Sequence, residues 1–445
     1  MSWVRKLSPI FAKISSALIA VQLLFSLNSA SAASPFGIPF MSLENATYGF
    51  EFEFSNPLIL KNWNPKKGLI PGYDDAYFDG REPFDAMRMA HVVAQLCAQS
   101  KDCQVKEESY KYFRNEFRVV FADGYWIRIS FDPACVEIQG KPLTKKEYRD
   151  KSELLEKYVF EAAKKAGLVL DRKEGMGHFN IGAQSAFGRD EVNGLRFLSY
   201  FVDFQNHPEL SMGAIGKDVG GNSPTLTVLH PSQSAALQAL VTGVVKRKYK
   251  LSAVAAYINR YVYTHTLDNL SAQNNQLDRR ESQHNQAITV EDFEKFSRKQ
   301  FADKIDLPME IRPIFAQESI EQFILQIELF ELRNNFLAGR GYPLKFLNLK
   351  KNRFSKSELV SRFYVYVTEA GGDFEHFKPL LHKSLRNIAP DKFVLTGHLD
   401  LKRSEDLKLA KLHAPYIATS SWVRERFLKL FSDLESCLGL LSSSH

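Results

Sequence analysis

Aromatic and acidic residues alternate strictly at residues 49–54, which read GFEFEF. Strict alternation places successive side chains on opposite faces of a β-strand. The pattern therefore predicts a strand at 48–54 with three phenylalanines on its buried face and Glu51 and Glu53 on the other. The two carboxylates would stand about 7 Å apart. The two carboxylates repel each other unless water, a basic group or a cation compensates their charge. The pair can therefore be interpreted either as two metal ligands or as a glutamate face exposed to solvent.

Further hydrophobic patterns predict a chain of alternating short strands and helices. The other predicted strands are short and bounded by turn residues, and they lie at 104–107, 115–122, 125–131, 135–139, 176–182 and 307–315. The predicted helices have apolar residues at three- and four-residue spacing, and they lie at 83–98, 145–167, 191–204, 232–270, 319–336, 355–369, 374–388, 404–412 and 420–441. Hairpin turns and the lack of a nucleotide-binding glycine motif favour an α+β fold with a mostly antiparallel sheet covered by helices.

Composition places the chain among ordinary globular proteins. It has 445 residues, 44% of them hydrophobic and 24% charged, which is enough for a large core. The 34 phenylalanines indicate a thick aromatic core. The net charge of +7 is mild and contains no long basic run, so a nucleic-acid partner is not expected.

The first 32 residues have the pattern of a secretory signal peptide. Arg5, Lys6 and Lys13 precede and flank an apolar run at 14–27, and the small residues Ala30-Ser31-Ala32 follow. We expect cleavage after Ala32, export to the periplasm or medium, and no stable membrane insertion afterwards. An uncleaved N-terminal membrane anchor is the alternative, although the apolar run is shorter than a membrane span requires. We divide the rest into a catalytic domain at 33–345 and a helical C-terminal extension at 346–445.

The four cysteines are even in number, as in many exported proteins with disulfides. Cys97, Cys103, Cys135 and Cys437 permit two disulfides in three pairings, and Cys97 and Cys103 are near enough in sequence to close a small loop. Four buried thiols are the alternative. The absence of a C-x-x-C motif argues against a zinc ribbon or a thioredoxin-type site.

Four strand-like segments carry ionisable or amide side chains at alternate positions of an otherwise apolar pattern. These side chains are Glu51, Glu53, Glu137, His178, Asn180, Glu310 and Arg312. Four carboxylates and an imidazole on adjacent strands would form an oxygen-rich site that suits Mg²⁺ or Mn²⁺ better than zinc. An arginine beside such a site favours a phosphate ligand. Metal, phosphate and arginine together are typical of phosphoryl transfer.

Each of these residues also has a simpler structural interpretation. His178 lies in a strand segment bounded by glycines and fits a core histidine whose nitrogens are hydrogen-bonded. Glu137 would then pair with a lysine or arginine. Arg312, two residues from Glu310 on the same strand face, would simply neutralise it.

The order of the motifs resembles the amidoligase family of carboxylate–amine ligases, which shares its fold with glutamine synthetase and glutamate–cysteine ligase. The resemblance covers about residues 46–315. It rests on a G-x-E-x-E strand, an acidic strand ending near Pro-Leu, a G-x-H-x-H/N strand and a late E-x-R strand, matched by Gly49, Glu51, Glu53, Glu137, Pro142, Leu143, Gly177, His178, Asn180, Glu310 and Arg312. The chain departs from the family in having Asn180 where the second histidine is common.

The resemblance implies a curved antiparallel sheet that forms a funnel, as in glutamine synthetase. ATP and Mg²⁺ (or Mn²⁺) would bind among the metal ligands Glu51, Glu53, Glu137, His178 and Glu310. His178, Arg312 and Arg280 would contact the nucleotide, with Arg279 as an alternative to Arg280. Arg312 would act catalytically at the γ-phosphate, and Asn180 would orient the substrate. The implied reaction is ATP-dependent formation of an amide or peptide-like bond between a carboxylate and an amine through an acyl phosphate.

Two other functions are compatible with the same residues. One is an exported, non-catalytic protein that binds a peptide or cell-wall fragment, and the other is a metal-dependent hydrolase. Export favours these alternatives, because ATP is scarce outside the cell. That difficulty would disappear if the protein were delivered into another cell or if its N-terminal segment were an anchor that kept the domain inside.

Overall fold

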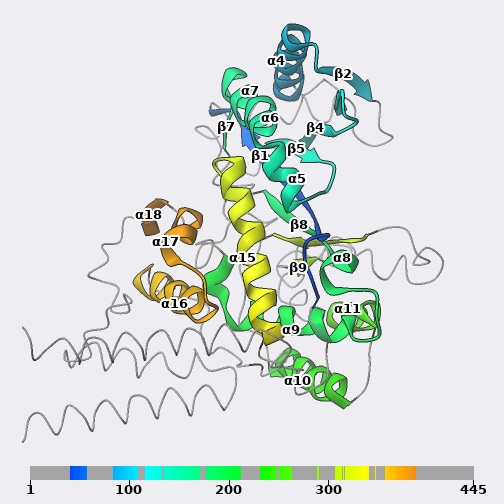
Figure 1. Ribbon diagram of the computed structural model, residues 1–445, viewed down its shortest axis with the longest axis vertical. Helices are drawn as coiled ribbons and strands as arrows, with labels where there is room; N and C mark the ends of the chain where they lie inside the picture. The colour runs from blue at the N-terminus through cyan, green and yellow to red at the C-terminus, as the bar shows by residue number, and fades with distance from the viewer. Residues whose placement is uncertain are drawn as a thin grey trace, which may run out of the picture.

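The fold is α+β, with helices packed against a mostly antiparallel, open sheet (Figure 1). The computed structural model describes residues 41–57, 84–108, 116–132, 135–170, 177–211, 231–246, 250–262, 288–289, 306–312, 314, 316–339, 346, 356–381 and 383–386. All strand pairings in these ranges are antiparallel. The predicted signal peptide lies outside the described residues. Within them, no helix has the length and apolarity needed to cross a membrane.

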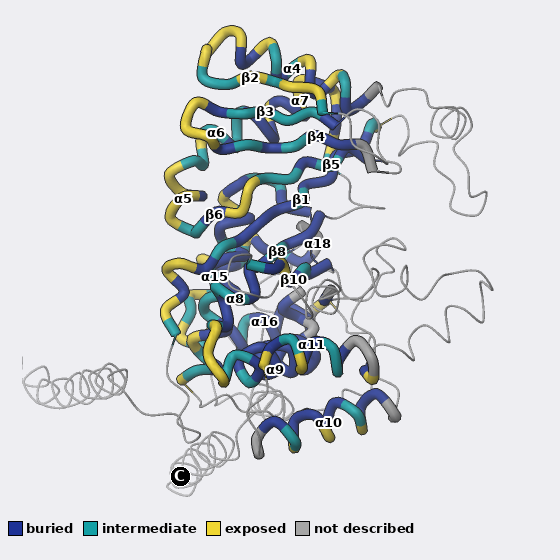
Figure 2. The backbone as a smooth tube through the Cα atoms, turned by 90° about the vertical axis from the view of Figure 1, so that its right-hand side faces the viewer, coloured by how far each residue is buried: buried dark blue, intermediate teal, exposed yellow. Residues whose placement is uncertain are grey.

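Strand β1 (Thr47–Ser55) lies in the middle of the sheet, and the other strands follow on both sides of it (Figure 2). On one side the order outward is β5 (Cys135–Gly140), β4 (Trp126–Asp132), β3 (Glu116–Phe121) and β2 (Cys103–Glu108). On the other it is β8 (His178–Gly182), β10 (Pro308–Ile311) and β9 (Ile288–Thr289). Two-residue strands β6 (Leu143–Thr144) and β7 (Val169–Leu170) also pair with β1.

One face of the sheet is apolar and carries the aromatic core. The rings of Phe50 and Phe52 stack on each other at 4.3 Å, and both contact Phe323 edge-on at 5.7 and 5.6 Å. Phe160 packs on Phe52 at 5.0 Å, and Tyr148 packs on Phe323 at 5.0 Å. Burying each such ring contributes about 2 kcal/mol. This confirms the predicted aromatic core and fixes which face of the alternating strand β1 is buried.

Most helices begin and end close to the predicted positions, but two predictions of single helices are wrong. The helix predicted at 232–270 is divided at Lys250 and the one predicted at 374–388 at Leu381, because the backbone of both residues is extended. In sequence order they are α4 (Phe84–Ser100), α5 (Lys145–Asp150), α6 (Ser152–Leu155), η2 (Glu156–Glu161), α7 (Ala162–Lys165), α8 (Ala183–Phe187), α9 (Asn193–Asn206), η3 (Pro208–Ser211), α10 (Pro231–Lys246), α11 (Leu251–Tyr257), η4 (Ile258–Val262), α15 (Ile320–Gly339), α16 (Lys356–Glu369), α17 (Phe374–Phe377), η5 (Lys378–Leu380) and α18 (Lys383–Arg386). The helix predicted at 145–167 is interrupted by the π-helical turn η2. Thr144 and Glu147 form the capping box that begins it.

The segment that begins near residue 346 packs against the helices beside the sheet. Helix α16 contacts η3, and η5 contacts α15. Figure 1 shows α16, α17 and α18 as one group on the side of α15. The helices predicted at 404–412 and 420–441 lie outside the described residues, so the proposed extension as a whole remains a prediction.

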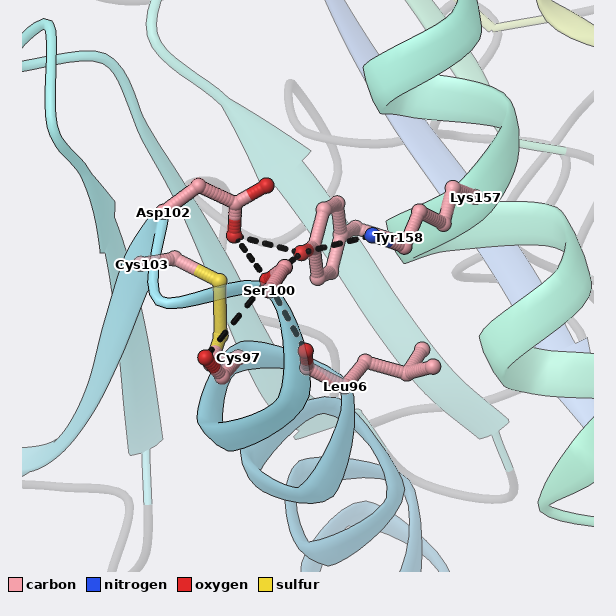
Figure 3. The surroundings of a disulfide bond; sticks show 7 residues. All are labelled: Leu96, Cys97, Ser100, Asp102, Cys103, Lys157 and Tyr158. Carbon is pink, nitrogen blue, oxygen red and sulfur yellow. Dashed lines mark hydrogen bonds between the residues drawn. A yellow bond between two sulfur atoms is a disulfide. The ribbon is translucent and has the colours of Figure 1, made fainter.

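A disulfide joins the end of α4 to the first residue of the edge strand β2, as the sequence spacing suggested. Cys97 and Cys103 are bonded, with their Cα atoms 4.9 Å apart. The Tyr158 hydroxyl donates a hydrogen bond to the Asp102 carboxylate at 2.6 Å and lies 2.7 Å from the Ser100 hydroxyl (Figure 3). Cys135 is buried on β5, and Cys437 lies outside the described residues, so the second predicted pairing stays open.

Candidate functional site

The second face of the sheet is polar, and it gathers most of the residues singled out by the sequence. In an antiparallel pair, residues directly opposite each other point to the same face. Glu51 lies opposite His178, and Glu53 lies opposite Glu137. Two residues further along these strands, Asn180 lies between Gly49 and Glu310. The six predicted side chains of these strands therefore share one face, in the middle of the sheet.

Two carboxylates converge on one nitrogen of His178. The Nδ1 atom lies 2.6 Å from Oε2 of Glu51 and 2.6 Å from Oε1 of Glu310. One ring nitrogen carries at most one proton, so it can donate to only one of these oxygens at a time. Ligand atoms of the three side chains all lie within 4.8 Å of one another. Their chemistry and spacing fit a divalent cation held by two carboxylates and an imidazole.

His178 is buried, and its electrostatic surroundings favour a positive charge. Burial alone would lower the pKa of His178, but the carboxylates of Glu310 and Glu51 outweigh it and hold the pKa well above its ordinary value. The other ring nitrogen, Nε2, is buried without a hydrogen-bond partner in the described part of the chain. It lies 3.9 Å from Oε1 of Glu53. The imidazole thus provides the cation that these acids require when no metal is bound.

Glu53 and Glu137 form a second pair of acids next to this cluster. Glu53 is buried on β1, with 5% of its surface exposed, and Glu137 is half-buried directly across on β5. Like charges directly opposite each other destabilise a sheet. Oε1 of Glu137 accepts a hydrogen bond from Nε2 of Gln139 at 2.6 Å. The pair lies on the Nε2 side of His178 and enlarges the acidic centre.

Arg312 and Asn180 each hold one of the converging carboxylates. Nη1 of Arg312 donates to Oε1 of Glu310 at 2.7 Å, and the guanidinium is buried. Nδ2 of Asn180 donates to Oε1 of Glu51 at 3.1 Å. The simpler interpretation of Arg312, neutralisation of Glu310, is therefore realised in the structure, and it is compatible with a role at the site. Arg279 and Arg280 lie outside the described residues.

Two glycines allow the strands of this site to approach closely. Gly177 has φ +74°, and a Cβ added to it would lie 2.4 Å from the backbone oxygen of Glu51. A Cβ added to Gly49 would lie 3.3 Å from Cβ of Asn180. Only glycine adopts the first conformation without strain, and its lack of a side chain keeps β8 in register with β1. Both are glycines of the sequence motifs.

The sequence analysis missed the polar residues that continue this face toward β2. Gln139 accepts a hydrogen bond from Nη2 of Arg128, whose Nη1 lies 3.5 Å from Oε2 of Glu116. Nε of Arg118 lies 3.1 Å from Oε2 of Glu108. The signal was present, because Gln139 follows Glu137 at the next alternate position and Arg128 alternates with isoleucines.

Comparison with known protein families finds no matching family model, and comparison with curated proteins finds no matching sequence. The resemblance to the amidoligase family thus rests on the ordered motifs described above.

Proposed function

We propose that the chain is an ATP-dependent carboxylate–amine ligase whose active site is the polar face around Glu51, His178 and Glu310. The observation that carries this proposal is the convergence of two carboxylate oxygens on one nitrogen of His178, with Glu53 beside its other nitrogen. An oxygen-rich cluster of this kind suits Mg²⁺, which screens phosphate charge when bound. We further propose that the sheet is the curved wall of a glutamine-synthetase-like funnel.

The proposed reaction has two steps. A carboxylate oxygen of the substrate attacks the γ-phosphorus of ATP, the bond to the bridging oxygen breaks, and ADP leaves. The amine nitrogen then attacks the carbonyl carbon of the acyl phosphate, the carbon–oxygen bond to phosphate breaks, and inorganic phosphate departs with the proton of the amine. Arg312 supplies positive charge near the transferred group. Asn180 holds Glu51 in place for the cation.

Metal binding is the first experiment, because it requires neither substrate. We expect Mn²⁺ to raise the melting temperature of the mature chain, because a cation that binds only the folded state stabilises it. Glu51→Gln and Glu310→Gln should abolish the increase. Glu321→Gln, at an exposed position of α15, is the matched control and should keep it. An equal increase in all four proteins would exclude this cluster as the metal site.

Amine-dependent release of ADP separates the ligase from its alternatives. The mature protein is incubated with Mg²⁺-ATP and mixed pools of carboxylates and amines, and ADP is measured. A ligase releases ADP only when the amine is present, and Glu53→Ala should abolish this release. A hydrolase turns over without nucleotide, and a binding protein shows only stabilisation by a peptide. Either of the last two results would overturn the proposal.

A further inference from the structure

Three cations lie in a direct line across the outer strands of the polar face. Lys106 on β2 is opposite Arg118 on β3, and Arg118 is opposite Arg128 on β4. We call these three residues the cationic row. Adjacent strands stand about 4.8 Å apart, so the row spans about 10 Å. Like charges directly opposite each other destabilise a sheet, so this arrangement calls for anions on the same face.

Acidic residues of the neighbouring row compensate the cations only in part. Glu108 pairs with Arg118, and Glu116 pairs with Arg128. The five side chains therefore carry one surplus positive charge. The Nε atom of Arg128 is buried and has no hydrogen-bond partner in the part of the chain that the structure describes, whereas Nε of Arg118 lies against Glu108. The side chains as a whole retain 37% and 26% exposure, so an anion can reach their outer nitrogens.

The cationic row points at the acidic centre. Arg128 lies opposite Gln139, and Gln139 lies opposite Glu51, which in turn lies opposite His178. Arg128 is two strands from Glu51, or about 10 Å. The ring of Trp126, on the same face, stacks with the Arg118 guanidinium at 4.8 Å and fixes its plane. Figure 2 shows β2, β3, β4, β5 and β1 in this succession.

We propose that the cationic row binds a second acidic group of the substrate, so that the carboxylate substrate is a dicarboxylate. This inference rests on the proposed function, which places the activated carboxylate near Glu51 and His178. A remote acid about 10 Å away would then reach Arg128 and Arg118. Guanidinium groups bind carboxylates through paired hydrogen bonds, and Lys106 adds a point charge at the exposed end of the row.

The test compares suberate with octanoate, which has a chain of the same length but only one carboxylate. Each is titrated into the mature chain with Mg²⁺ present and without nucleotide, and binding is measured by calorimetry. We expect suberate to bind about tenfold more tightly, which is the effect of one charge-assisted hydrogen-bond pair. Arg118→Gln and the exposed Lys106→Gln should each weaken suberate binding and leave octanoate binding unchanged. Lys146→Gln on α5 is the matched control, and it should bind both as the unaltered chain does.

Equal affinity for suberate and octanoate, or an unchanged suberate affinity in both row variants, would overturn the proposal. Because no ATP is present, this result is independent of whether the protein releases ADP. A chain that binds suberate through the row but releases no ADP would disprove the ligase and leave the dicarboxylate site standing.

Discussion

At the scale of single residues, Gly177 allows β8, which carries His178, to approach β1, which carries Glu51. It precedes His178 and has φ +74°, a conformation that side-chain-bearing residues rarely adopt. An added Cβ would lie 2.4 Å from the backbone oxygen of Glu51. Glycine is therefore required at this position for two reasons: the positive φ, and the lack of space for a Cβ beside Glu51. Two alanine variants can distinguish these reasons.

Gly177→Ala should destabilise the fold by about 3 kcal/mol, because it combines backbone strain with a clash against β1. Gly167→Ala is the matched control. Gly167 has φ +73°, but no atom lies within 4 Å of its added Cβ. The Gly167→Ala variant should therefore lose only about 1 kcal/mol of unfolding free energy, which is the cost of the backbone strain alone. Urea unfolding of both variants measures the difference, and equal losses would show that close approach to Glu51 is unimportant.

At the scale of elements, alternation predicted the strands but not their partners. The buried face of β1 with its three phenylalanines could be predicted, because apolar and charged residues alternate along the strand with a period of two. Strands β6, β7 and β9 have two residues each, too few to show a period. The π-turn η2 was missed because its apolar spacing resembles that of an α-helix. That Glu51 lies opposite His178 follows from chain pairing over more than a hundred residues, which no local pattern encodes.

Buried ion pairs fasten helix α16 to the elements beside the sheet. Nε of Arg362 donates to Oε2 of Glu209 at 2.8 Å, and Nδ1 of His207 lies 2.9 Å from Oε1 of the same carboxylate. On the neighbouring turn, the Tyr366 hydroxyl donates to Asp203, which also accepts from Arg333 of α15. Removing one member would leave a buried charge uncompensated, so this network ties α16 to η3, α9 and α15.

The Glu209 pair predicts a specific loss of stability in acid. Burial raises the pKa of Glu209, but Arg362 and His207 outweigh it and lower the pKa from 4.5 to about 2. A carboxyl whose pKa is lower in the folded state than in the unfolded state stabilises the protein at pH values above the unfolded-state pKa. For Glu209 this contribution disappears as the pH falls from 4.5 toward 2. The loss should be about 3 kcal/mol.

Chemical unfolding at a series of pH values measures this contribution. The double variant Glu209→Gln/Arg362→Gln removes both charges, so its stability should fall less steeply over that pH range than that of the unaltered chain. Glu321→Gln, exposed on α15, should keep the original profile. An acid loss of the same size in the double variant would assign the effect to other carboxyls.

At the scale of the whole molecule, the two faces of one sheet differ sharply in polarity. The aromatic face binds the helices, and the polar face carries an acidic centre beside a cationic row. Alternation with large apolar residues predicted which side chains belong to the acidic centre, but not how they pair. The cationic row escaped notice because Lys106, Arg118 and Arg128 come from three strands, and each alone resembles a solvated surface charge.

The disulfide ties this architecture to the compartment in which the chain folds. Disulfides form in oxidising compartments, so we predict that the bond between Cys97 and Cys103 forms only when the chain is exported. We expect the full chain, expressed in bacteria, to yield a mature protein that begins at Ala33, which N-terminal sequencing would detect. Its peptide containing both cysteines should stay cross-linked until it is reduced, which mass spectrometry after alkylation would detect.

The same chain expressed in the cytoplasm without residues 1–32 provides the matched comparison. Its Cys97 and Cys103 should be alkylated without reductant, and its free energy of unfolding should be lower by about 2 kcal/mol, the value expected for a short closed loop. Reduction should bring the exported form to the same stability. Ser100 at the end of α4 and Asp102 just before β2 still bond to Tyr158 of η2, so the reduced form should remain folded. An intact N-terminus with both thiols reduced in the full-length product would instead favour the anchored alternative, with the domain kept inside the cell and within reach of ATP.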